Sequence, residues 1–592
     1  MNTCVIDFES YYDQHISLRK LNYTEYVHKT TPMLVATIYQ GRITCTDRIA
    51  EHLATIDWPN TTLVAHNALF DALLLKQKYG YEAQHYADTL CYARLLHPTI
   101  KHDLGTLQEC FIPEGQFKDS SSLKTVKGKH FHALCPDDQT QLTAYCRNDV
   151  LLCGRLYDLW KDQIPETEQH LIDHTIKTFI NPQLILDIEK AKAFLREELR
   201  QTDDALIESG LTKETLRSDA QFAKYLESKG YTPPVQFSAK QQKTIPSFSK
   251  TSSSFQAFYT AHPELKTLLD LKRRVNSNIK ESRTTGLITA AQINNGKIPI
   301  AYNYCGAFTG RFSGANKLNM QNLPRGSILR DAIMAPEDSL LVVCDLAQIE
   351  ARVLAWVAKE DAILETYRQR KDMYCEMASV IFDKPINKKD HPDERFVGKS
   401  AVLGLGYSMS APKFQEYCAL QGRTLDLQLC YNVVDTYRKK FPNIPELWKL
   451  LSDTINILYQ RRSLTINHAL KAENGCLILP SQRRLNYQGL DYNDHEQTWR
   501  LPNQKKVYGA LIVENCIQAI SRDILAEQLL TIHRHYPVVM HTHDEIIAIV
   551  PETDAEQAKE FILTTMTTTP AWAPGLPLDA EAAIGKRYGD CK

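Results

Sequence analysis

Residues 341–358 combine two hydrophobic patterns that predict a buried strand followed by a helix. The four consecutive apolar residues from Leu341 to Cys344 are typical of a strand inside a core. Apolar positions then recur with helical spacing at Ile349, Val353, Leu354 and Val357. Asp345 lies where the two elements meet, and it is either a helix N-cap or a metal ligand held between rigid elements. This stretch alone favours the cap, and only acidic residues elsewhere in the chain favour the metal ligand.

Residues 1 to about 165 alternate β-rich runs with helical patterns, which predicts an α/β unit. A strand through the opening CVIDFES would place Asp7 and Glu9 on one face, because side chains alternate along a strand. A second apolar run leads through Asn67 into a helix that carries Asp71 in its first turns. Acidic residues therefore lie on the first predicted strand and soon after the second.

A third acidic position of this unit lies on a helix predicted over residues 142–160. Tyr145 and Asp149 are four residues apart there, so they lie one above the other on a single face. Either of them alone is typical of a solvated surface helix. With the two earlier stretches, however, the chain offers four acids and a tyrosine with geometry suited to one site.

These stretches resemble, in order, the three motifs of 3′-to-5′ proofreading exonucleases that use four carboxylates and a tyrosine. The matches are Asp7 and Glu9, then Asn67 and Asp71, then Tyr145 and Asp149. The resemblance implies that the four carboxylates bind two divalent ions, that Tyr145 orients the attacking water and that Asn67 contacts DNA. Crowded carboxylates suit this role, because they repel one another unless cations neutralise them.

The region from about 166 to 300 is polar and mostly helical in pattern. An amphipathic helix is predicted near residues 189–210, and residues 233–254, rich in Pro, Lys and Ser, predict a loop. A cationic stretch follows, with Lys272, Arg273, Arg274, Lys280 and Arg283 among few acids. It is either a solvated face or an arm that grips the DNA backbone through phosphate contacts.

Bulk properties narrow the class of protein. A chain of 592 residues exceeds one hydrophobic core and predicts about three or four domain-sized units. No apolar run approaches the roughly 20 residues of a membrane span, and the acid at position seven does not fit a secretory leader. The 15 cysteines include no C-x-x-C pair, so reduced thiols and a cytoplasmic location are expected. With a net charge of -1, any nucleic-acid channel must come from local cationic clusters.

Residues 395–410 predict a helix with a cationic stripe. Arg395, Lys399 and Tyr407 stand at i, i+4 and i+12, an arrangement suited to a triphosphate and a base. Gly404 and Gly406 would each cost a helix about 1 kcal/mol relative to Ala. Their presence predicts a bend or the close approach of another group.

Residues 538–550 predict a β-hairpin in which two apolar arms flank His543, Asp544 and Glu545. His541 and His543 raise the alternative of a zinc site, since imidazole and carboxylate are zinc ligands. No cysteine or distant H-x-x-x-H completes such a site, so the carboxylate-tipped hairpin is favoured.

Five stretches from residue 309 onward resemble the motifs of family A DNA polymerases. They are TGRFS (309–313), MQNLP (320–324), DLAQIEAR (345–352), the Arg395–Lys399–Tyr407 helix and the His543–Asp544–Glu545 hairpin. The chain departs from the family at Leu346 and Ala347, where the family has Tyr-Ser, and at Leu403, where many cellular members have an aromatic residue. Leu-Gly-Leu-Gly-Tyr is more similar to bacteriophage members, and Leu403 bears on how the sugar is selected.

The resemblance implies a role for each matched position. Asp345 and Asp544 would hold two metal ions with the Leu346 carbonyl, and Glu545 would assist. Residues implied in nucleotide binding are Gln348, Glu350, Arg395, Lys399, Tyr407 and His543. Glu350 would pack with Tyr407 to exclude a 2′-hydroxyl. DNA contacts are implied for Arg311, Gln321, Asn322 and Gln518, and Arg283 is assigned to the DNA-gripping arm. Arg483 and Arg484 are expected to contact the DNA backbone or to lie on a solvated loop.

The fold expected from these motifs is multidomain α/β and α+β, a ribonuclease H-like exonuclease domain followed by a right-hand polymerase domain. The exonuclease would span residues 1–165 and the polymerase 166–592. Within the polymerase, thumb-like helices would occupy about 185–300, the palm 301–358 and 465–592, and the fingers 359–464.

The expected function is template-directed DNA synthesis with proofreading, in phage DNA replication. The expected cofactor is Mg²⁺, two ions per active site, with Mn²⁺ as a substitute. Partners would be primer-template DNA, dNTPs and a processivity factor or helicase-primase, and the protein would act as a monomer without a membrane. Two alternatives remain: a single-subunit RNA polymerase, against which the exonuclease motifs argue, and a catalytically silent DNA-binding scaffold, which would not need so many clustered acids.

Overall fold

A computed structural model describes residues 2–113, 125–238, 242–249, 252–277, 279–324 and 326–591. The chain forms two compact units. The first contains Met1–Leu184, Pro299–Asn322 and Ala335–Lys592, and the second contains Ile185–Ile298 and Leu323–Met334. Within the described ranges, no helix has both the length and the apolar character needed to cross a membrane.

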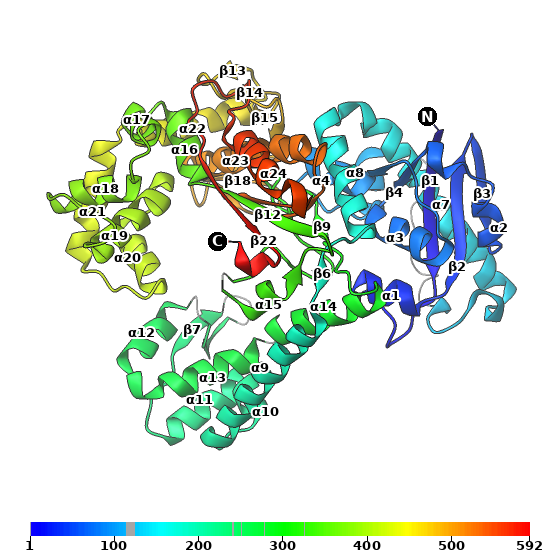
Figure 1. Ribbon diagram of the computed structural model, residues 1–592, viewed down its shortest axis with the longest axis horizontal. Coiled ribbons are helices and arrows are strands. Elements are labelled where there is room, and N and C mark those ends of the chain that lie inside the picture. The colour runs from blue at the N-terminus through cyan, green and yellow to red at the C-terminus, as the bar shows by residue number, and fades with distance from the viewer. Residues whose placement is uncertain are drawn as a thin grey trace. The chain divides into compact units, whose positions relative to one another are not determined.

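The N-terminal part of the first unit is built on a five-stranded sheet of order β3-β2-β1-β4-β5, in which β4 and the edge strand β5 run parallel to β1 (Figure 1). Its strands are β1 (Asn2–Ser10), β2 (Pro32–Tyr39), β3 (Arg42–Thr46), β4 (Thr61–Ala65) and β5 (His85–Asp88). Its helices are α1 (Tyr23–Lys29), α2 (Ile49–Leu53), α3 (Ala68–Tyr79), α4 (Thr89–Leu96), α5 (Leu104–Phe111), α7 (Pro136–Trp160) and α8 (Glu166–Ile180). The long helix α7 packs on β1 and β2, which places Tyr145 and Asp149 next to the strand that carries Asp7 and Glu9.

The C-terminal part of the same unit is centred on an antiparallel sheet of order β20-β21-β12-β22. Its strands are β12 (Ser339–Leu346), β20 (Val538–His541), β21 (Glu545–Pro551) and β22 (Ala580–Gly585). The helices packed on the sheet are α23 (Gly509–His533) and α24 (Ala555–Thr567), and α16 (Ile349–Ala358) packs on α23. Most buried positions of helix α23 are apolar, with Ser521, Arg522, Asp523 and Gln528 as the polar exceptions, and the helix forms the central support of this region.

Between α16 and α23 the chain forms a helical subdomain and several short strands. The helices are α17 (Asp361–Arg368), α18 (Met373–Phe382), α19 (Pro392–Gly404), α20 (Ala411–Leu420), α21 (Leu427–Lys440) and α22 (Asn443–Tyr459). The strands are β13 (Leu464–Thr465), β14 (Lys471–Glu473), β15 (Cys476–Ile478), β16 (Arg484–Asn486), β17 (Asp491–Asn493), β18 (Thr498–Arg500) and β19 (Lys506–Val507). Earlier in the chain, before α16, β9 (Tyr302–Asn303) pairs with β10 (Ser313–Gly314).

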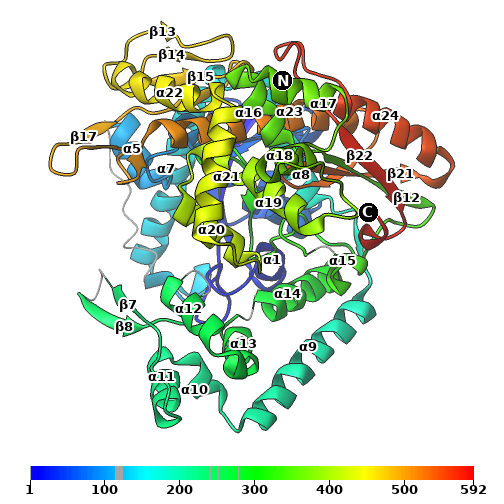
Figure 2. The same ribbon diagram turned by 90° about the vertical axis from the view of Figure 1, so that its left-hand side faces the viewer.

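The second unit is mostly helical, as its polar amphipathic pattern predicts, and α9 runs through it as one long helix (Figure 2). Its helices are α9 (Ile188–Ser209), α10 (Lys213–Arg217), α11 (Asp219–Ser228), α12 (Ser253–Ala261), α13 (Lys266–Asn276), α14 (Ile279–Ile293) and α15 (Ile328–Asp331). Its strands are β6 (Ile185–Leu186), β7 (Val235–Ser238), β8 (Lys243–Pro246) and β11 (Ile333–Met334). The domain limits expected from the sequence stay predictions.

Two local predictions are wrong, and the helix-cap alternative for Asp345 is excluded. Residues 233–254 are not a plain loop, because β7 and β8 pair as an antiparallel hairpin; residues 239–241 and 250–251 lie outside the described ranges. The helix predicted over 395–410 ends at Gly404 and continues as a 3₁₀ turn, η5 (Leu405–Tyr407), so Tyr407 leaves the helical stripe. Asp345 is not the cap of α16, because that position belongs to Gln348, whose φ is 55°.

Candidate active sites

The polymerase-like acids meet where β12 and β21 pair. Asp345 lies opposite Glu545 in this antiparallel ladder, and the backbone N–H of Leu346 donates to the carbonyl of Asp544 at 2.8 Å. β20 and β21 form the hairpin predicted from the sequence, with Asp544 in its turn. Strand pairing therefore brings together three acidic residues from stretches about 200 positions apart.

The three acids differ in their surroundings. Glu545 is buried and accepts a hydrogen bond from the hydroxyl of Tyr588. Tyr588 lies 43 positions further along the chain, so the sequence pattern did not predict this contact. Asp544 accepts from the Thr542 hydroxyl at 3.3 Å. Asp345 and Asp544 are half-buried rather than buried. Asp345 and Asp544 thus suit a bound cation better than Glu545 does, because the Glu545 side chain is buried and hydrogen-bonded to Tyr588.

A cavity of about 280 Å³ opens beside these acids. Its lining includes Arg311, Gln348, Glu350, Tyr407, His543 and Asp544. Glu350 joins two of them, because one carboxylate oxygen pairs with Arg311 and the other accepts from the Tyr407 hydroxyl at 3.2 Å. Burial, and then the neighbouring Glu350 carboxylate, raise the pKa of Tyr407 well above its usual value, which keeps the hydroxyl protonated as a donor.

The cationic helix contributes one paired and one exposed side chain. Arg395 forms an ion pair with Asp372 at 2.8 Å and lies over the ring of Tyr374. Lys399 is exposed. Asp372 caps α18 by accepting from two backbone N–H groups. An aspartate before an apolar helix is a recognisable cap signal in the sequence, but its pairing with Arg395 is not.

The exonuclease-like acids also come together. Ligand atoms of Asp7, Glu9 and Cys146 all lie within 4.8 Å of one another. Asp71, in the first turn of α3, is fully buried, and burial followed by the charge of Asp7 raises its pKa well above the usual value. Asp149 is also buried. A carboxylate kept out of water beside another one needs a cation or a proton, so this donor set fits a divalent metal ion.

Tyr145 belongs to the same cluster. Burial raises its pKa, and the charges of Asp149, Glu9 and Asp7 add to that effect. Cys146 was not predicted, although its thiol lies 3.6 Å from an Asp7 carboxylate oxygen. Its position next to Tyr145 in the sequence was the available signal.

A family model described as DNA polymerase family A matches residues 187–590, and one described as 3′-5′ exonuclease matches residues 35–164. The chain belongs to DNA polymerase family A. It carries an N-terminal 3′-5′ exonuclease domain, and enzymes of both families generally depend on divalent metal ions. The family resemblance drawn from the motifs is therefore confirmed.

Relatives of this family A chain include bacterial and phage proteins. It is 21% identical to DNA polymerase I of Borreliella burgdorferi over 554 residues, covering 90% of this chain and 56% of that protein. It is 30% identical to the DNA polymerase of Bacillus phage SP02 over 282 residues, covering 44% of this chain and 43% of that protein. The chain thus spans about half the length of these two relatives. With DNA polymerase I of Aquifex aeolicus the identity is 22%, covering 89% of this chain and 88% of that protein.

The fold matches a solved family A structure. The polymerase domain of Pol1 from M. smegmatis, in complex with DNA primer-template and dNTP, superposes with a TM-score of 0.70 at 16% identity. The match covers 99% of this chain and 95% of that one. The expected fold, an exonuclease domain followed by a polymerase domain, is confirmed.

The positions implied in DNA contact by this family resemblance are spread over the molecule. Gln518 lies on α23 and donates to Glu514 at 3.0 Å, and Asn67 has its side-chain amide 3.0 Å from the Tyr23 hydroxyl. Gln321 and Asn322 lie in the first unit, and Arg283 lies on α14 in the second. Their DNA contacts stay predictions.

Two cations singled out in the sequence are structural. Lys272, placed in the DNA-gripping arm, is buried and pairs with Asp219 at 2.7 Å. Arg483, expected at the DNA backbone or on a solvated loop, is buried and pairs with Asp523 at 2.7 Å. Both expectations are wrong for these two residues, because charge patterning along the chain does not reveal burial. His541, the other ligand of the disfavoured zinc site, is buried against the rings of Tyr302 and Phe312.

Proposed function

We propose that this chain extends a DNA primer along a template and removes mismatched nucleotides from the primer 3′ end at a separate site. The observation that carries the proposal is the meeting of Asp345 and Asp544 beside the cavity lined by Glu350, Tyr407 and His543. A nucleotide bound in this cavity would have its triphosphate close to the two acids. The Thr309–Arg311 and Asp345–Arg352 stretches that resemble family motifs lie in the same unit as these residues.

Divalent cations fit both acidic clusters. Asp345, Asp544 and the Leu346 carbonyl would hold two Mg²⁺ ions, or Mn²⁺ as a substitute, and Asp7, Glu9, Asp71 and Asp149 would hold the second pair. When bound, such ions neutralise charge on the attacking and leaving oxygens of a phosphodiester.

The protein side chains would bind the incoming nucleotide and the DNA. Lys399 and Arg395 would bind the phosphates of the incoming nucleotide, for which Arg395 must share or leave its partner Asp372. Tyr407 would present its ring to the base, and His543 would lie near the primer end. In the exonuclease site Tyr145 would orient the attacking water. Contacts from Arg311, Gln321, Asn322, Gln518 and Arg283 would hold the duplex.

The proposal also covers the domain limits, the partners and the location of the protein. Residues 1–165 would be the exonuclease and 166–592 the polymerase, acting as a monomer on primer-template DNA and dNTPs. Similarity to the phage SP02 polymerase supports a bacteriophage-type enzyme. Such an enzyme would work in the host cytoplasm and would receive processivity and helicase-primase functions from partners.

A primer with one mismatched 3′ nucleotide tests the proposal. With all four dNTPs and Mg²⁺, the protein should remove the mismatch and then extend the corrected primer to full length. A phosphorothioate at the terminal linkage, which resists excision, serves as the matched control and should suppress removal. Primer-independent synthesis from ribonucleotides would instead support a single-subunit RNA polymerase, and DNA binding without either reaction would support a scaffold.

A further inference from the structure

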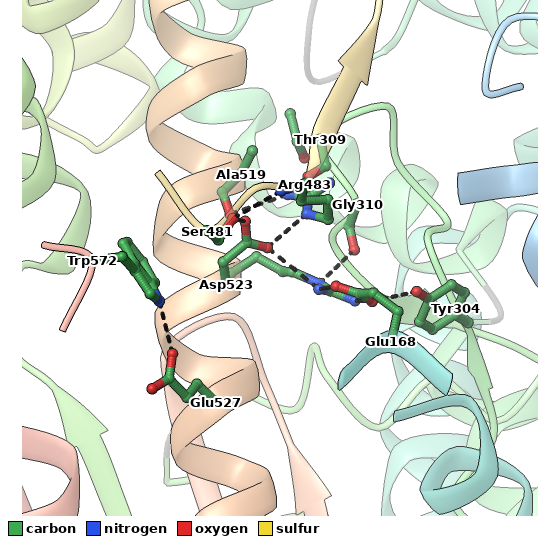
Figure 3. A network of polar contacts seen from close by, with 11 residues as sticks. Glu168, Tyr304, Thr309, Gly310, Ser481, Arg483, Ala519, Asp523, Glu527 and Trp572 are labelled. Carbon is green, nitrogen blue, oxygen red and sulfur yellow. Dashed lines mark hydrogen bonds and ion pairs between the residues drawn. The ribbon is translucent and has the colours of Figure 1, made fainter. Parts of the chain in front are cut away.

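Four charged side chains form a buried ionic network between α8 and α23 (Figure 3). They are Glu168, Arg483, Arg522 and Asp523, each with a side chain no more than 6% exposed. Two positive and two negative charges balance one another. Charges so far from water persist only when each one is paired and hydrogen-bonded.

Glu168 and Arg522 form the first half of the network. The two terminal nitrogens of Arg522 donate to the two oxygens of Glu168 at 2.5 and 2.8 Å, a forked pairing. The hydroxyl of Tyr304 also donates to Glu168. Burial alone would raise the pKa of Glu168, but Arg522, together with Arg483 and the Tyr304 hydroxyl, outweighs burial and lowers the pKa, so the carboxylate is charged.

Arg483 and Asp523 form the second half. The Nε of Arg483 donates to Asp523 at 2.7 Å, and Ser481 donates to the other Asp523 oxygen at 2.5 Å. Arg522 reaches the same Asp523 carboxylate at 3.3 Å, which joins the two halves.

Both arginines also hold the backbone just before Arg311. Arg522 donates through Nε to the Gly310 carbonyl at 3.1 Å, and Arg483 donates to the Thr309 carbonyl at 2.9 Å. Gly310 has a φ of 85°, which disfavours any residue with a Cβ. A Cβ there would also lie 2.5 Å from a terminal nitrogen of Arg483. The loop is therefore fixed in one conformation by buried donors.

The loop ends at the cavity. Arg311, the next residue, pairs with Glu350, and Glu350 accepts from Tyr407. An unbroken series of contacts thus runs from Glu168 through Arg522 and the Gly310 carbonyl to Arg311 and the other groups that line the cavity. On its other side α8 is anchored in the exonuclease region, where Asp173 accepts from the backbone N–H of Tyr86 at 2.9 Å.

We propose that Glu168 is a positioning residue of the polymerase site: by fixing Arg522 it sets the Thr309–Gly310 backbone and hence the reach of Arg311 to Glu350. The inference rests on the proposed polymerase function. Without the Glu168 charge, Arg522 keeps a buried positive charge and only Asp523 to balance it. Its guanidinium would then turn away from the Gly310 carbonyl, and Arg311 would lose its fixed position.

A Glu168→Gln variant tests this role, because it keeps the side-chain shape and removes the charge. We expect kcat/KM for a correct dNTP to fall about ten-fold or more, mostly through a higher KM. Exonuclease activity on a single-stranded oligonucleotide should stay at the wild-type rate. The matched control is Glu166→Gln on the same helix, whose side chain is 88% exposed; it should leave both reactions unchanged.

Combining the change with Arg311→Ala separates positioning from a general loss of structure. If Glu168 acts through Arg311, adding Glu168→Gln to Arg311→Ala causes no further loss of extension. Losses that multiply, an equal fall in both activities, or wild-type extension by Glu168→Gln would each overturn the inference. Should Glu168→Gln not fold, Arg522→Lys retains the charge but lacks the fork; it should show the same selective loss, and normal extension by it would refute the role. A wild-type protein that does not extend primers would instead refute the proposed function.

Discussion

Replacing Glu350 with Ala should weaken the preference for deoxyribonucleotides over ribonucleotides. Among the described residues, Glu350 is the one acceptor for the Tyr407 hydroxyl, at 3.2 Å, and it also pairs with Arg311. Without the carboxylate, the Tyr407 ring loses the bond that holds it against the cavity, and the space beside the 2′ position of the sugar opens.

The magnitude follows from the kind of bond that is lost. A hydrogen bond to a charged group contributes about 1.5–3 kcal/mol, and every 1.4 kcal/mol is about ten-fold in a ratio of rates. The Glu350 side chain is 34% exposed, so water competes for it and the lower end of this range applies. We expect the ratio of kcat/KM for dNTP to that for rNTP to fall about ten-fold.

Single-nucleotide incorporation with matched dNTP and rNTP, on one primer-template, measures this ratio. Tyr407→Phe is the matched control, because it removes the hydroxyl and leaves the Glu350–Arg311 pair in place. It should shift the ratio in the same direction by a smaller factor. An unchanged ratio in Glu350→Ala, with extension intact, would refute the reasoning.

Three further predictions concern stability and DNA affinity. Burial lowers the pKa of His541 from 6.5 to about 4, because the folded state disfavours the charged ring. The stability that neutral His541 contributes above pH 6.5 should therefore be lost as the pH falls toward 4. The free energy of unfolding should fall by about 3 kcal/mol over this range. Urea unfolding at pH 7 and pH 4 checks this, and His541→Phe should lack that part of the loss. A Cβ at Gly398 would collide with the Tyr374 carbonyl oxygen, whereas the nearest atoms to a Cβ at Gly404 belong to the flexible end of Met409. Gly398→Ala should therefore lower the free energy of unfolding by about 1–3 kcal/mol, and Gly404→Ala should not lower the melting temperature. Lys272→Ala should destabilise the protein by about 1–3 kcal/mol, because it removes packing and breaks the pair with Asp219. Arg274 is exposed, so Arg274→Ala should weaken DNA binding in a salt-dependent way and leave stability unchanged.

The elements that carry the acids were predictable because their patterns are local. Alternation in CVIDFES indicates a strand with one buried face, the apolar run before Asp345 indicates a strand inside a core, and the structure has β1 and β12 at these places. Tyr145 and Asp149 share a helix face for the same reason. The family motifs then indicated which of these stretches belong to one site.

What failed depends on contacts between distant segments. Arg483 and Lys272 are charged residues in polar stretches, and solvation is the ordinary state of such residues. Each is buried because a partner arrives from another element, Asp523 from α23 and Asp219 from α11. The 3₁₀ turn at Tyr407 was predicted in part, because Gly404 and Gly406 indicated a bend or the close approach of another group, and a Cβ at Gly406 would lie 2.5 Å from Leu354. The role of Glu168 was invisible for the same reason, because Arg522 lies 354 positions away.

The most direct test of the central claim compares Asp345→Ala with Asp7→Ala on the mismatched primer. The account predicts that Asp345→Ala still removes the mismatched nucleotide but adds none, and that Asp7→Ala cannot remove it yet extends a correctly paired primer at the wild-type rate. Primer extension by Asp345→Ala, or loss of both reactions in either variant while it remains folded, would contradict two separate active sites on one chain.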